Sequence, residues 1–111
     1  MDIAFRTGKL SRIFNSAELL RAEYGKEQAA VIMRRIMFLK AAPNLENVPH
    51  TPPTERHELK GRRKGEFAVT LKQPYRLTFK PNHEPVPLKD DGGIDLKRVT
   101  AILILDVEDY H

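Results

Sequence analysis

Apolar residues in the first half of the chain recur at the three- and four-residue steps of a helix, forming two stripes. The first stripe consists of Leu10, Ile13, Phe14 and Ala17. The second consists of Ala29, Ile32, Met33, Ile36 and Met37. Gly25 ends the first helix or the loop after it. The second helix is predicted over 26–40 and stops before Pro43, since proline disfavours helix in the residue preceding it. We expect the two helices to pack as an antiparallel hairpin.

The apolar period then changes from 3.6 to 2, which is typical of strands. Alternation over 67–71 and 75–79 predicts two strands joined by a tight hairpin turn at Gln73-Pro74. Residues 99–107 form a β-branched apolar run that predicts a central strand buried on both faces. Residues 2–6 alternate polar and apolar, as in a short strand.

Two proline-rich segments connect these elements. Residues 43–54 contain four prolines and predict an ordered surface loop, whereas 81–98 predicts a long, mobile hairpin loop. The order of elements indicates one α+β domain over 1–111, with an N-terminal strand and a two-helix hairpin packed on one face of a small antiparallel sheet. The opposite face would then be uncovered. Arg76 alternates along its strand with Tyr75 and Leu77, so its side chain can point from this uncovered face.

Composition narrows the class of protein. The chain has 111 residues, of which 41% are hydrophobic, enough for one modest core and too many for a disordered chain. The longest purely apolar run, 101–105, is five residues and far short of the ~20 that span a bilayer. No signal peptide is visible, so we expect a cytoplasmic protein without membrane contact. The absence of cysteine excludes disulfides, thiolate–metal sites and thiol catalysis.

Positive charge is concentrated in one segment. The net charge is +4, but residues 56–81 alone carry eight Lys and Arg against two acids. Residues 82–111 carry three against seven. A concentrated basic segment suits a polyanion, because each neutralised phosphate releases counterions. The alternative is a solvated basic face that binds nothing.

Two short segments contain candidate chemistry: 56–65, with His57 and a cluster of cations, and Asp109-Tyr110-His111. Cleaving RNA without a metal requires a base for the 2′-OH proton, an acid for the leaving 5′ oxygen, and cations for the charge on phosphorus. Histidine suits both proton-transfer roles, and the planar fork of Arg76 matches phosphate oxygens. His50 and His83 lie in proline-rich loops and receive no role.

The chain resembles the RelE/HigB-type toxins of bacterial toxin–antitoxin systems, and more narrowly the HigB-like plasmid maintenance killer branch. The resemblance rests on the two N-terminal helices, His57-Glu58-Leu59-Lys60-Gly61-Arg62-Arg63-Lys64-Gly65, Tyr75-Arg76-Leu77-Thr78-Phe79 and Asp109-Tyr110-His111. It implies a RelE-like fold and a metal-independent mRNA endonuclease that acts on the ribosome without a cofactor. The branch usually has tryptophan where this chain has Phe67 and Tyr75, and its counterpart of segment 80–98 is shorter and less acidic.

The resemblance also implies residue roles. The catalytic set would be His57, Arg76, Asp109, Tyr110 and His111, with His57 and His111 transferring protons in an order that stays open. Contacts to RNA would come from Lys60, Arg62, Arg63, Lys64 and Arg76. The partners would be the ribosome, mRNA and a HigA-like helix-turn-helix antitoxin, in a homo-dimer or a toxin–antitoxin hetero-oligomer.

Two other functions stay open. One is a non-nucleolytic toxin of the same superfamily acting on DNA gyrase, like ParE-type proteins. These generally lack the terminal nuclease residues, so Asp109-Tyr110-His111 argues against it. The other is a basic RNA-binding domain without chemistry, whose binding would depend strongly on salt.

Overall fold

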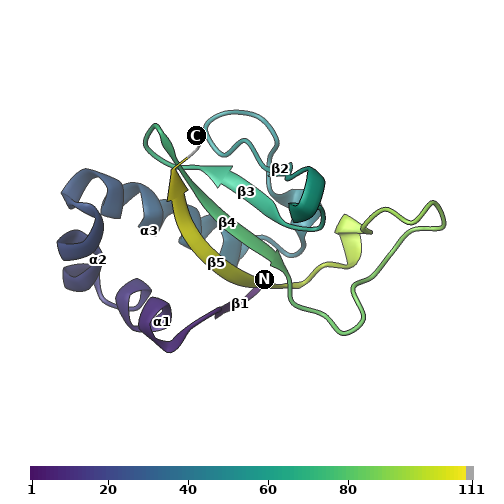
Figure 1. Cartoon of the computed structure of the whole chain (residues 1–111), viewed down its shortest axis with the longest axis horizontal. Coiled ribbons are helices and arrows are strands. Elements are labelled where there is room, and N and C mark those ends of the chain that lie inside the picture. Colours follow the sequence, from purple (N-terminus) through teal and green to yellow (C-terminus); the bar gives the residue numbers. More distant parts are fainter. Residues whose placement is uncertain (110–111) are drawn as a thin grey trace.

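A computed structural model describes residues 1–109 as helices covering one face of a five-stranded sheet (Figure 1). The strands are β1 (Asp2–Phe5), β2 (His57–Glu58), β3 (Phe67–Thr70), β4 (Tyr75–Pro81) and β5 (Ala101–Asp109). The α-helices are α1 (Gly8–Phe14), α2 (Ala17–Tyr24) and α3 (Lys26–Ala41). Short 3₁₀ turns follow at η1 (Leu45–Asn47), η2 (Gly61–Arg63) and η3 (Leu96–Arg98). The predicted α+β class is confirmed.

The sheet has the order β1-β5-β4-β3-β2, and its pairs are antiparallel except for β1 with β5. The N-terminal strand therefore joins the sheet as a parallel edge strand, where the sequence predicted only an antiparallel sheet. Two parallel strands need a long connection between them, and here the segment between residues 5 and 101, with the helices and the strands β2–β4, connects β1 to β5. The parallel register places Ile3 beside Ile102 and Phe5 beside Ile104.

The first helix predicted from the sequence is interrupted at Asn15 and Ser16, so that it forms two helices, α1 and α2. The Ser16 hydroxyl accepts a hydrogen bond from the Leu19 amide at 3.1 Å and so caps α2. The Asn15 side chain donates back to the Ser11 carbonyl at 2.8 Å. Short polar side chains compete in this way with helical backbone hydrogen bonds. The apolar periodicity takes no account of these polar side chains, so it did not reveal the break. The predicted hairpin is consequently a three-helix layer.

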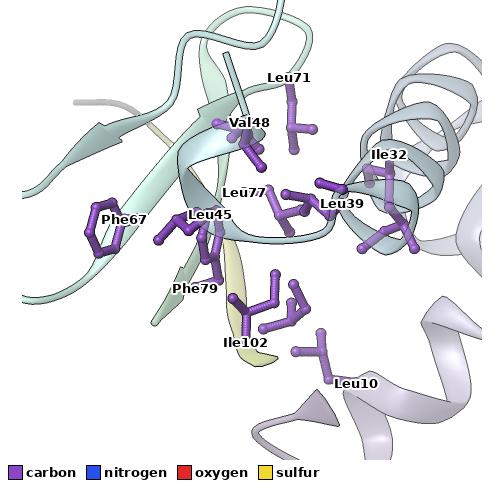
Figure 2. Packing of buried hydrophobic residues seen from close by; sticks show 14 of the residues in the cluster. Leu10, Ile32, Leu39, Leu45, Val48, Phe67, Leu71, Leu77, Phe79 and Ile102 are labelled. Carbon is purple, nitrogen blue, oxygen red and sulfur yellow. The ribbon is translucent and has the colours of Figure 1, made fainter. Parts of the chain in front are cut away.

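The core lies between α1–α3 and the inner face of the sheet (Figure 2). Leu77 and Phe79 of β4 and Ile102 of β5 are fully buried there, opposite Ile32 and Leu39 of α3. Strand β5 is buried at Ile102, Ile104 and Leu105, but its other positions are half-buried or exposed. The prediction that this strand is buried on both faces is thus wrong, because its outer positions Ala101, Leu103, Asp106 and Glu108 are only half-buried.

The proline-rich segment 43–54 is an ordered loop with mostly exposed residues, as predicted, but it also contributes side chains to the core. Leu45 and Val48 are completely buried in the core. Their backbone carbonyls accept hydrogen bonds from Nη1 of Arg56, at 2.7 and 2.9 Å. One guanidinium therefore ties both carbonyls together, and that of Leu45 also accepts the Val48 amide within η1.

The predicted β3–β4 hairpin is present, and the long loop between β4 and β5 forms its own backbone ladder. Leu88 bridges to Ile94 in an antiparallel pairing within this loop. At its base, Nε2 of His83 accepts hydrogen bonds from the amides of Thr100, at 3.0 Å, and Ala101, at 3.3 Å. His83, which had no role by sequence, anchors the loop to the sheet.

Candidate functional site

The helices leave the outer face of the sheet uncovered, and the strand register gathers candidate side chains there. His57 pairs with Ala68, Ala68 with Thr78, and Thr78 with Asp106, so these residues form one row on one face. Arg76 pairs with Glu108 two positions along the same strands, hence on the same face. The strand spacings put the Cα atoms of His57 and Arg76 about 12 Å apart.

The imidazole of His57 has a defined orientation. Its Nδ1 lies 3.0 Å from the carbonyl oxygen of Glu55. A carbonyl only accepts, so Nδ1 carries a hydrogen, and Nε2 is the nitrogen that can take up or give a proton. The backbone of Glu55, which presents this carbonyl, has a φ of 52°. This value lies in the left-handed region that non-glycine residues seldom adopt.

The basic turn, defined here as residues 60–64, lies between β2 and β3. Lys60, Arg62 and Lys64 are exposed, whereas Arg63 is partly buried. The Arg63 side chain lies against acids: Nε donates to Oε1 of Glu66 at 2.7 Å, and Nη1 and Nη2 donate to Oε1 and Oε2 of Glu108 at 2.5 and 2.7 Å. The four predicted RNA contacts of the basic turn are therefore three exposed cations and one, Arg63, that is paired on every nitrogen.

Glu108 is a central residue of this face that the sequence analysis missed. Besides Arg63, it accepts a hydrogen bond from the Thr78 hydroxyl at 2.7 Å and lies 3.7 Å from Nη2 of Arg76. The hydrogen bonds from Arg63 lower the pKa of Glu108 to about 2, with Thr78 and the positive charge of Arg76 contributing. Two features point to Glu108: it directly precedes Asp109-Tyr110-His111 in the sequence, and it is in register with Arg76 across the strand pair.

The low pKa of Glu108 predicts acid sensitivity. The carboxylate should stabilise the fold fully above its unfolded value near 4.5, and this contribution should vanish as pH falls towards 2. We expect urea unfolding to show a loss of ~1–2 kcal/mol in this window, reduced by the partial exposure of the pair. Glu108→Gln should remove that slope, whereas Glu18→Gln, at an exposed position on α2, should keep it. An unchanged slope in the Glu108 variant would contradict the assignment.

Of the predicted terminal triplet, the structure describes Asp109. Asp109 is the exposed last residue of β5 and pairs with Tyr75, one step out of phase with Glu108. Strand alternation thus directs it away from the face that bears Arg76. Tyr110 and His111 lie outside the described residues. Their predicted catalytic roles stay predictions.

Several cations of the basic segment serve the fold. Arg56 binds carbonyls of segment 45–48, and Lys72 pairs with Glu27 of α3. Together with the pairing of Arg63, this reduces the positive charge available to a ligand. The exposed remainder consists of Lys60, Arg62 and Lys64 of the basic turn and Lys80 on β4.

Across residues 1–109, no three His, Asp or Glu side chains gather closely enough to hold a metal ion. In the same range, no helix combines the length and apolarity that crossing a bilayer requires.

Comparisons with known proteins give one informative result. Neither the protein-family models nor the curated proteins contain a match to this chain. Among solved structures, a YoeB/ParE toxin from Agrobacterium tumefaciens superposes with a TM-score of 0.57 over 100% of both chains, at 11% identity. The chain shares the YoeB/ParE toxin fold. This likeness confirms the fold implied by the resemblance. The chemistry of the face depends on its own side chains.

Proposed function

We propose that this chain is the toxin of a toxin–antitoxin system and that it cleaves mRNA on the ribosome without a metal. The observation that carries the proposal is that His57 and Arg76 share the helix-free face of the sheet, beside a turn of exposed cations. Their separation of about 12 Å between Cα atoms lets both side chains reach one phosphodiester. The toxin fold and the three sequence motifs support the same conclusion.

The chemistry is transfer of the phosphoryl group to the neighbouring 2′-oxygen. A base removes the 2′-OH proton, the oxygen attacks phosphorus, and the 5′-oxygen leaves as it gains a proton. Nε2 of His57 provides one of these proton transfers, and Arg76 stabilises the charge that develops on the phosphoryl oxygens. The resemblance assigns the remaining roles to Asp109, Tyr110 and His111.

RNA binding would depend on Lys60, Arg62 and Lys64, which are exposed at the edge of this face. The acidic loop between β4 and β5 borders the basic turn at Lys64 but lies away from Arg76. It leaves from the end of β4 at Pro81 and enters β5 at Ala101, whereas Arg76 and Glu108 lie at the other ends of these strands (Figure 1). We further propose a HigA-like helix-turn-helix antitoxin as partner and the cytoplasm as the place of action.

The test is primer extension on mRNA from translating ribosomes incubated with the purified protein. We expect new 5′ ends with the natural chain and none with His57→Ala or His111→Ala. A supercoiling assay with DNA gyrase, run in parallel, should show no inhibition. Gyrase inhibition with intact mRNA would overturn the proposal and favour the non-nucleolytic toxin. Salt-dependent RNA binding without either activity would favour a plain binding domain.

A further inference from the structure

The carboxylate of Glu108 connects separate elements of the candidate face. Its oxygens contact Arg63 from η2, Thr78 and Arg76 from β4, and it belongs to β5 itself. Arg63 lies 45 positions earlier in the chain, so the contact between them is purely tertiary. One carboxylate therefore holds the basic turn against the strand that ends at Asp109.

We propose that Glu108 is a positioning residue of the RNA-cleaving site, and that Arg63 is its structural partner and not a phosphate ligand. This inference rests on the proposed function and reassigns one of its predicted RNA contacts. The Arg63–Glu108 pair is called the clamp below.

The geometry of the clamp supports a structural role for Arg63. Two parallel hydrogen bonds join the guanidinium to Glu108, and the third nitrogen donates to Glu66. Fork-to-fork pairs of this kind combine charge with a fixed orientation. These carboxylates occupy both two-pronged edges of the guanidinium, so a phosphate that binds Arg63 with two hydrogen bonds would have to displace a carboxylate. Its neighbours Lys60, Arg62 and Lys64 form no ion pairs within residues 1–109.

The clamp acts on catalysis through Arg76 and through the basic turn. The Arg76 side chain is only 17% exposed and lies within charge contact of Oε1 of Glu108. The same oxygen accepts from Arg63, so the two guanidinium groups are placed relative to each other. Misplacing a catalytic group by about 1 Å can cost up to a hundredfold in rate. Loss of the clamp should therefore have a larger effect on the rate of RNA cleavage in the bound complex than on the affinity for RNA.

The test compares neighbouring arginines in the ribosome-dependent cleavage assay, with binding of a single-stranded RNA oligonucleotide measured as a function of salt. Arg63→Lys keeps the charge but loses the fork. We expect it to lower kcat about tenfold or more, with KM and the salt slope nearly unchanged. The matched control Arg62→Gln should instead raise KM, retain kcat and reduce the salt slope by roughly 0.7.

Glu108→Gln should also lower kcat about tenfold, without weakening RNA binding, since it removes a negative charge from the face. The double variant Arg63→Gln/Glu108→Gln should be no slower than the slower single variant, because both changes remove the same contact. Faster cleavage by Glu108→Gln would show that the carboxylate competes with phosphate, and would overturn the inference. So would an Arg63→Lys variant that behaves like Arg62→Gln.

The clamp and the proposed function can be rejected independently of each other. If the natural chain cuts no mRNA, the nuclease proposal fails, and the clamp is judged by urea unfolding of the same variants. A double variant that unfolds at the midpoint of Arg63→Gln alone supports a structural pair. Independent, additive shifts in the midpoint would show that Arg63 and Glu108 do not act as a unit, and the clamp would be rejected.

Discussion

Arg76→Gln is expected to reduce mRNA cleavage by about 10²–10³-fold, the usual cost of removing one group that stabilises developing negative charge. The Arg76 side chain shares the face of His57, and its pair with Glu108 holds it beside Thr78 on the uncovered side of the sheet. Glutamine retains hydrogen-bond donors but has neither the charge nor the two-pronged geometry. The measurement is the rate of appearance of new 5′ ends at saturating protein.

Lys80→Gln is the matched control for this prediction. Lys80 is an exposed cation of the same strand, at the end of β4 remote from Arg76, and it has no assigned role in the site. We expect it to retain cleavage while lowering the net charge by the same amount. Equal activity of the two variants would show that general electrostatic attraction, and not a group at position 76, accounts for the rate.

Phe79→Ala is expected to have the largest effect on stability, a loss of ~3–5 kcal/mol in the free energy of unfolding. The ring is fully buried and stacks on Phe67, with ring centroids 6.0 Å apart (Figure 2). Alanine would leave a cavity between β3, β4 and the helices. Domains of this size are stable by only ~5–15 kcal/mol, so the variant should be partly unfolded at 37 °C. Urea denaturation followed by circular dichroism measures the change.

Phe79→Leu provides the comparison, since it retains most of the apolar volume and should cost clearly less than the alanine variant. Phe38→Ala gives a second comparison, because that ring is 44% exposed on α3 and leaves no core cavity. An equal loss in the Phe38 and Phe79 variants would contradict the core assignment.

Amphipathic patterns predicted the main elements. The alternation over 67–71 and 75–79 corresponds to β3 and β4, and the stripe over 26–40 corresponds to α3. These predictions succeed because burial of one face imposes a period that is visible locally. Patterning did not reveal the break at Asn15 and Ser16, nor the burial of Leu45 and Val48, since a cap and a buried loop have no period.

The α+β class and the candidate residues His57 and Arg76 could be predicted from the sequence, because apolar period and residue chemistry are properties of short segments. The use of the cations depends on tertiary contacts. The tertiary structure pairs Arg63 with Glu108 and places Arg56 on the carbonyls of segment 45–48. It also joins β1 to β5 in parallel. The reason is that a charge in the sequence has no partner until the chain folds, and Arg63 and Glu108 meet across 45 positions.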